Sequence, residues 1–187
     1  MTKTLVETLK IITPSQFRLL TKEAIKAPRK RAHLLLHTGH ADQVQRLAIA
    51  AQPGTYVRPH QHSKQWEVLV LLRGGFDVLL FEPNGKLLER KTLDESTPYV
   101  QIPILAWHTC YVRKQNTVIL ELKPGPFRPN EFADWAPPEG TKQAGDLLRW
   151  MSRARHGRFA QSDLRASLPA CGATTLRTRH VQGTELQ

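Results

Sequence analysis

Short apolar segments separated by turn-forming residues dominate the chain from about residue 32 onward. They are rich in apolar or β-branched side chains and comprise residues 34–36, 44–50, 56–58, 66–72, 76–81, 87–93, 99–102, 107–112 and 118–123. The sequence Pro83-Asn84-Gly85 predicts a hairpin turn between the segments 76–81 and 87–93. Because no helical pattern interrupts this series, the sequence predicts an all-β sandwich or barrel.

Helical patterns lie on both sides of the strand-rich region. Thr13-Pro14 is a favourable helix start, and the helix should end before Pro28. Its apolar face repeats at helical spacing through Phe17, Leu20, Ala24 and Ile25. After the last strand, a segment rich in Pro and Trp should lie as an ordered loop over the barrel. Apolar residues at 147–151 then predict a short helix that packs back on it.

These patterns divide the chain into four parts. Residues 1–30 form an N-terminal helix with a basic loop, and residues 31–125 form the barrel. Residues 126–151 form the loop and short helix packed on the barrel. Residues 152–187 form a basic C-terminal extension, which we expect to be partly mobile.

The positive charge of the chain is concentrated outside the predicted barrel. The formal net charge is +11, of which residues 1–31 carry +6 and residues 152–187 carry +4. The barrel is therefore almost neutral. Such basic flanks are typical of a solvated surface, so this distribution disfavours binding of nucleic acid.

Neither a membrane span nor a secretory signal is recognisable. The longest apolar run, at residues 68–72, is far too short to cross a bilayer, and the N-terminal segment lacks an apolar core. We therefore expect a cytoplasmic protein without a membrane partner. Its two cysteines, Cys110 and Cys171, have no metal-finger spacing, and a reducing compartment disfavours a disulfide between them.

Three polar residues near the middle of the chain have the spacing of metal ligands. His60 and His62 stand two apart, so on a strand they point to the same face. Glu67 follows after a short polar turn, and His108 lies in a later strand-like segment. Three imidazoles and one carboxylate make a suitable ligand set for one divalent ion, which would be Fe(II), Mn, Ni or Zn.

Further polar residues in apolar strands are candidates for the substrate pocket. Glu121 and Lys123 share a strand face and can pair; together with Glu67 they are the candidate catalytic residues. The candidate pocket residues are Arg46, Tyr56, Arg58 and Cys110. A charge in such a strand either turns outward to water or serves function. Cys110 is either a small buried residue lining the barrel or a ligand or reactive thiol.

The metal-ligand pattern resembles the first sequence motif of the cupin superfamily. The matching residues, in register with that motif, are Gly54, His60, His62, Glu67 and Gly74. The second cupin motif is matched at Pro103 and His108 only. Its remaining positions differ, because Thr97 and Leu105 replace two glycines and Val112 replaces an asparagine. The resemblance implies a cupin barrel, that is, a double-stranded β-helix or jelly roll.

A closer resemblance covers about residues 12–150 and points to the WbuC family of cupin-fold metalloproteins. It rests on residues 31–33, 45–46, 54–62, 121–127 and 135–139. Members of that family often belong to gene clusters for surface polysaccharide (O-antigen). The resemblance therefore implies a metal site and a link to polysaccharide biosynthesis, but it does not define a reaction.

Two functional hypotheses follow from these observations. The first is a metal-dependent enzyme acting on a small sugar-derived or anionic substrate, by isomerisation, epimerisation or oxygenation. The second is a non-catalytic module that binds a small molecule or a metal. A pocket beside His108 that is filled by side chains would favour the second hypothesis. Pairing of Val- and Leu-rich strands into a homodimer is compatible with either.

Overall fold

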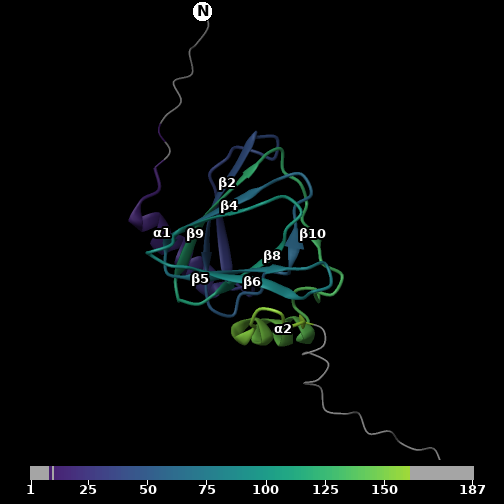
Figure 1. The fold of residues 1–187 in the computed structure, drawn as a ribbon. Coiled ribbons are helices and arrows are strands. Elements are labelled where there is room, and N and C mark those ends of the chain that lie inside the picture. The colour runs from purple at the N-terminus through teal and green to yellow at the C-terminus, as the bar shows by residue number, and fades with distance from the viewer. Residues whose placement is uncertain (1–8, 10, 161–187) are drawn as a thin grey trace, which may run out of the picture.

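Two five-stranded antiparallel sheets form the body of the protein (Figure 1). The structure is a computed structural model and describes residue 9 and residues 11–160. The first sheet has the strand order β1 (Arg31–Leu35), β2 (Val44–Ala51), β9 (Thr117–Pro124), β4 (Glu67–Arg73) and β7 (Tyr99–Ile102). The second has the order β10 (Glu131–Phe132), β3 (His60–Gln61), β8 (Trp107–Val112), β5 (Phe76–Phe81) and β6 (Leu87–Leu93). This arrangement confirms the predicted all-β class and is a cupin β-barrel of the jelly-roll type.

Side chains that alternate between the two faces of β5 explain its continuous apolar sequence. Phe76 and Val78 pack between the sheets with Leu69 and Ile119, while Leu79 on the opposite face belongs to a separate cluster beneath the second helix. The strand is therefore buried on both faces. The predicted hairpin forms, since β5 pairs with β6 and the Gly85 N–H donates to the Glu82 carbonyl oxygen at 2.9 Å.

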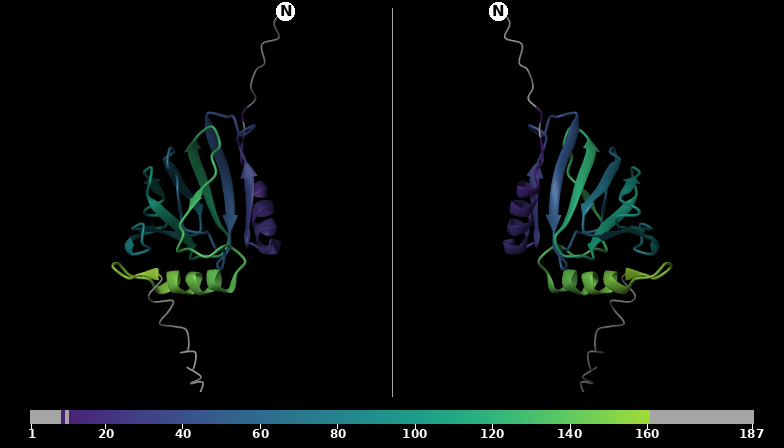
Figure 2. Two further views of the ribbon diagram at one scale, coloured as in Figure 1. Left: turned by 90° about the vertical axis from the view of Figure 1, so that its right-hand side faces the viewer. Right: turned by 90° about the vertical axis from the view of Figure 1, so that its left-hand side faces the viewer.

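One helix covers each sheet on its outer side (Figure 2). Helix α1 (Pro14–Lys26) begins at Thr13, whose side chain accepts a hydrogen bond from the Gln16 N–H, and ends before Pro28 as predicted. Its Leu20 and Ala24 pack on Ala48 of β2, where a small side chain allows close approach. Helix α2 (Lys142–Arg153) buries an apolar face of Leu147, Trp150 and Met151 against the outer side of β5 and β6. Among the described residues no helix is long and apolar enough to span a membrane.

The strand predicted at residues 56–58 is absent, and a short strand begins at His60 instead. Pro59 offers no N–H to a neighbouring strand. Side chains satisfy the preceding carbonyl groups: Arg31 donates to Tyr56 O at 2.7 Å and Thr109 donates to Val57 O at 2.5 Å. The backbone therefore reaches the histidines without pairing as a strand.

The C-terminal extension is described only in part. Ser152 and Arg153 complete helix α2, and Phe159 forms an isolated β-bridge with Lys86. The expectation of a mobile basic segment falls mainly on residues 161–187, which lie outside the described residues. The division of the chain into four parts stays a prediction.

We expect a Gly74→Ala substitution to destabilise the barrel at the turn between β4 and β5. Gly74 has φ +93°, and an added Cβ would lie 2.7 Å from Thr117 Cα, in the backbone of the adjacent strand β9. A left-handed backbone costs about 1–2 kcal/mol for an L-residue, and overpacking adds roughly 1–3 kcal/mol. The free energy of unfolding from urea denaturation should fall by about 3 kcal/mol.

Gly140→Ala is the matched control, because φ is +85° there and no heavy atom of the described residues lies within 4 Å of the added Cβ. Equal losses in the two variants would contradict the close approach to Thr117.

Candidate metal centre

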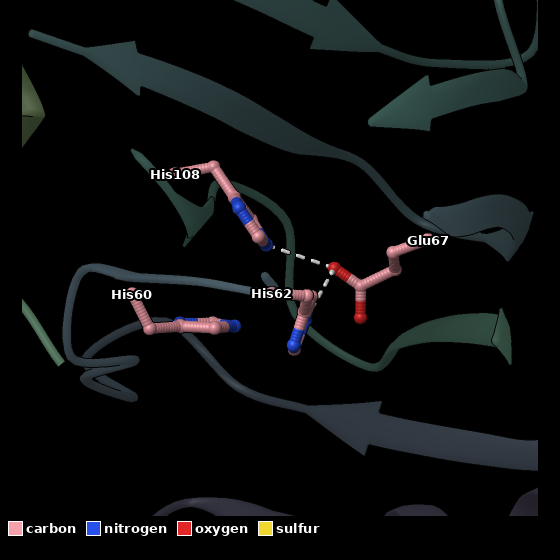
Figure 3. Close-up of side chains that lie close together, drawn as sticks. All are labelled: His60, His62, Glu67 and His108. Atoms are coloured by element: carbon pink, nitrogen blue, oxygen red, sulfur yellow. Dashed lines mark hydrogen bonds and ion pairs between the residues drawn. The ribbon is translucent and has the colours of Figure 1, made fainter. Parts of the chain in front are cut away.

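Both sheets contribute to a cluster of three histidines and one glutamate (Figure 3). His60 on β3 pairs directly with His108 on β8, which places two imidazoles side by side on the second sheet. His62 follows β3, and Glu67 opens β4 on the first sheet. The four residues predicted as ligands therefore converge between the two sheets.

The cluster is compact and buried. The four potential donor atoms all lie within 4.8 Å of one another, and every residue is at most 5 % exposed. His108 Nε2 lies 2.8 Å from Glu67 Oε2, and His62 Nε2 lies 3.7 Å from the same oxygen. Donors bound to an ion at about 2.1 Å are separated by at most about 4.2 Å. The observed cluster therefore needs only small shifts to bind one ion.

Backbone carbonyl groups fix the orientation of two of the imidazoles. His60 Nδ1 lies 2.8 Å from Arg58 O, and His108 Nδ1 lies 2.8 Å from Ala106 O. A carbonyl oxygen only accepts, so each Nδ1 carries the proton and each Nε2 presents its lone pair to the cluster. For His108 this lone pair faces a carboxylate oxygen. Either a proton or a metal cation must lie between these two atoms.

His62 provides the clearest indication that the site fits a metal. Both of its ring nitrogens are buried, and neither has a hydrogen-bond partner among the described residues; Nε2 approaches Glu67 Oε2 only to 3.7 Å. Leaving a buried polar group unsatisfied costs about 1–3 kcal/mol. A divalent ion bound by His62 and its three neighbours would satisfy this group, and nitrogen and oxygen donors suit a first-row ion. The residues present therefore fit the predicted ion.

The protonation states of the cluster suit metal binding. Burial, together with the neighbouring His108, lowers the pKa of His60 to about 3, so its imidazole is neutral. Burial opposes ionisation of Glu67, but the His108 hydrogen bond, the nearby His62 and the charge of Lys123 lower its pKa well below the ordinary value. Neutral imidazole and ionised carboxylate are the forms that bind metals.

Glu121 and Lys123 lie beside the cluster on β9. Lys123 Nζ is 2.6 Å from Glu121 Oε1 and 3.4 Å from Glu67 Oε1, the oxygen that does not face the histidines. Burial and the charge of Glu67 raise the pKa of Glu121 to about 7. Burial opposes the charge of Lys123, but Glu121 and Glu67 outweigh it and raise the pKa of that ammonium group. The candidate catalytic residues thus form one connected group.

A cavity of about 600 Å³ lies between the sheets, and three residues of the cluster, His60, Glu67 and His108, line it. Among the other predicted site residues, Cys110, Glu121 and Lys123 line it, and burial raises the pKa of the Cys110 thiol well above its ordinary value. An open cavity beside His108 is the arrangement expected for binding a small molecule.

Three predicted pocket residues lie elsewhere. Arg46 is exposed on the outer face of β2, because strand alternation turns its neighbours Gln45 and Leu47 inward. Tyr56 packs towards α2 and donates to Pro137 O at 2.8 Å. Arg58 donates to Ala136 O at 2.9 Å, its guanidinium lies over the ring of the cavity residue Phe132, and its carbonyl orients His60.

The sequence prediction missed several residues that line the cavity. They include His33 on β1 and Phe127, Asn130 and Phe132 in the segment after β9. The spacing of Arg31, His33 and Leu35 at every second residue was a usable signal for β1, since all three line the cavity. The later segment has no periodic pattern that would have placed it there.

Comparisons with known proteins give one family profile and several similar solved structures. The profile described as Domain of unknown function (DUF6016) matches residues 12–93, and no match was found among curated proteins. Among solved structures, KdgF from Halomonas sp. is similar with 17% identity and a TM-score of 0.44, over 55% of this chain and 85% of that chain.

Two further solved structures show a similar degree of likeness. A cupin 2 domain-containing protein from Halorhodospira halophila has 17% identity and a TM-score of 0.45, over 76% of this chain and 85% of that chain. An oxalate oxidase in complex with the substrate analogue glycolate has 15% identity and a TM-score of 0.46, over 57% of each chain. The sheet topology and the buried cluster remain the basis for describing the chain as a cupin-fold protein with a candidate metal centre.

Proposed function

We propose that the protein is a divalent-metal-dependent enzyme that acts on a small molecule bound in the barrel cavity. The observation that carries this proposal is the convergence of four buried donor residues beside an open cavity, which three of them, His60, Glu67 and His108, line directly. A protein that only stored a metal would have no need for the adjacent space. The open cavity therefore favours a protein that binds a small molecule over one that only stores a metal. The candidate acid–base pair of Glu121 and Lys123 on the cavity wall favours an enzyme over a non-catalytic small-molecule binder.

His60, His62, Glu67 and His108 would hold the ion. When bound, it supplies Lewis-acid polarisation of a carbonyl or hydroxyl group, or a site for dioxygen. Lys123 holds the second oxygen of Glu67, which leaves Oε2 facing the histidines. Glu121 and Lys123 lie on the cavity wall next to the cluster, and we assign them as the candidate acid–base pair. Such a pair suits isomerisation or epimerisation, and oxygenation stays an alternative reaction.

The finer assignments rest on the sequence motifs alone. These are membership of the WbuC family, a sugar-derived or anionic substrate and a link to surface-polysaccharide synthesis. A cytoplasmic location and a homodimer likewise stay predictions.

The metal content of the full-length protein tests the proposed function. Protein purified without an affinity tag or chelator should contain about one equivalent of a first-row ion, because nitrogen and oxygen donors bind such ions. Inductively coupled plasma mass spectrometry measures this metal content. Fe or Mn would direct the next assay to oxygen uptake, and Zn or Ni to isomerase screens. Negligible metal, both as purified and after incubation with each ion, would contradict the proposal.

A further inference from the structure

The cavity wall formed by the first sheet becomes apolar with distance from the metal centre. Beside Glu67 stands Lys123, which contacts it at 3.4 Å. In the next row, Glu121 of β9 pairs with Leu47 of β2 on one side and Leu69 of β4 on the other. In the row after that, Ile119 pairs with Ile49. All of these residues line the cavity, so the wall formed by β2, β9 and β4 changes from polar to apolar. On the neighbouring strand β1 the cavity residues Arg31 and His33 are polar, and His33 pairs with Ile49.

The facing wall shows the same gradient. On β8, the metal-site residue His108 is followed on the cavity side by Cys110 and then Val112, and Val57 lies on the same wall. Successive residues on one strand face are about 6.7 Å apart. The apolar wall therefore extends roughly 13 Å beyond the metal centre.

Beside the metal centre, several polar groups of the cavity wall are already engaged by other protein groups. Glu121 and Lys123 bind each other at 2.6 Å. The Gln45 amide donates to carbonyl oxygens of the 39–42 loop, including Asp42 O at 3.0 Å. Burying a hydroxyl without a partner costs about 1–3 kcal/mol. A ligand whose hydroxyls lie against the apolar stretch of Leu47, Ile49, Leu69 and Ile119 would therefore lose hydrogen bonds to water without replacement.

The polar end of the cavity favours a negatively charged group. A divalent ion and the Lys123 ammonium together carry more positive charge than the Glu67 and Glu121 carboxylates carry negative charge. An anionic ligand group that binds the ion would neutralise this excess positive charge.

From these observations we infer that the cavity selects an amphipathic acid, with a metal-binding carboxylate head and an apolar body against Leu47, Ile49, Leu69 and Ile119. This inference rests on the proposed metal centre and narrows its substrate class. It departs from the sugar-derived substrate that the family resemblance implies, and it retains the anionic one.

Three acids with the same 2-hydroxycarboxylate head test the inference. Glycolate has no chain beyond the head, 2-hydroxyhexanoate adds an apolar chain, and gluconate has the same six carbons with a hydroxyl on each further carbon. Their binding to zinc-loaded full-length protein is measured by isothermal titration calorimetry, and the zinc content is measured before and after. Burying one methylene group contributes about 0.8 kcal/mol of transfer free energy, so each buried methylene should lower the dissociation constant about fourfold. We expect 2-hydroxyhexanoate to bind at least about 30-fold more tightly than glycolate or gluconate.

A pair of variants on β2 localises the effect. Leu47→Asn places an amide in the cavity wall. It should weaken the binding of 2-hydroxyhexanoate about tenfold and leave the binding of glycolate unchanged. Val44→Asn is the matched control, since Val44 is on the same strand, is 45 % exposed and does not line the cavity. Gluconate binding as tightly as 2-hydroxyhexanoate, or affinity independent of chain length, would overturn this inference and leave the metal centre standing. A wild-type protein that takes up none of Fe(II), Mn, Ni and Zn would overturn the metal centre and this inference with it.

Discussion

The His60→Ala, His108→Ala double variant should purify with less than about a tenth of an equivalent of metal. It removes two of the four converging donors, which lie on paired positions of β3 and β8. Loss of even one residue that only orients a ligand typically weakens metal binding 10- to 100-fold. Removing two ligands should therefore weaken the dissociation constant by roughly 10³-fold or more. Metal titration and metal content both measure this change.

A second measurement separates metal loss from misfolding. Bound metal should raise the melting temperature of the wild-type protein, because a ligand present at 100 times its dissociation constant stabilises the native state by about 2.7 kcal/mol. The double variant should lack this response while retaining a cooperative transition. His33→Ala, His40→Ala is the matched control: both histidines line the cavity, but neither belongs to the cluster. If both double variants retain equal metal, His60 and His108 are not ligands.

Asp77→Leu should lower the free energy of unfolding by about 3 kcal/mol, because it breaks a buried ion pair and leaves one partner unpaired. The Asp77 side chain is 2 % exposed, and its Oδ2 accepts from Arg90 Nε at 2.8 Å and Nη2 at 2.5 Å. Its Oδ1 accepts from Thr92 at 2.8 Å. Urea denaturation measures the loss.

Arg90 also joins this pair to helix α2, and a double-mutant cycle reveals that role. Its Nη1 donates to Met151 O at 2.7 Å, near the end of the helix. Replacing both members of a buried pair by apolar residues is often close to neutral. The double variant Asp77→Leu, Arg90→Met should therefore recover part of the lost free energy of unfolding, though not the hydrogen bond to the helix.

Glu89→Leu is the exposed control, since its partner Lys91 is 4.0 Å away and both side chains are more than half exposed. This substitution should change the free energy of unfolding by under about 0.5 kcal/mol. Purely additive effects of the Asp77 and Arg90 substitutions would contradict the coupling.

The class of fold was predictable because strand pairing leaves a period of two in the sequence. The strand β6, for example, falls at residues 87–93 in both the prediction and the structure. The two-residue strand β10 was not predictable, because Glu131 and Phe132 are both exposed and leave no alternation. A short strand of this kind is defined by its partner β3 and not by its own residues.

The ligand cluster was predictable for a different reason. His60, His62 and Glu67 are close in sequence, so local spacing alone brings their side chains together. His108 could be added because it lies in an apolar strand segment of its own. Tyr56 and Arg58 were misplaced because alternation was extended through Pro59, where the backbone does not pair as a strand. The period of two predicts the face to which a side chain points only where hydrogen bonds to a neighbouring strand keep the backbone in the strand conformation.

The deep burial of the cluster has a consequence for the kinetics of ion exchange. Its four residues are between 1 % and 5 % exposed, and three of them, His60, Glu67 and His108, line the cavity, along which an ion or chelator would pass. The rate of exchange would then be set by access through the cavity as well as by the strength of the bonds to the ion. A molecule that occupies the cavity would slow extraction of the ion by a chelator, even if its affinity for the ion itself is small.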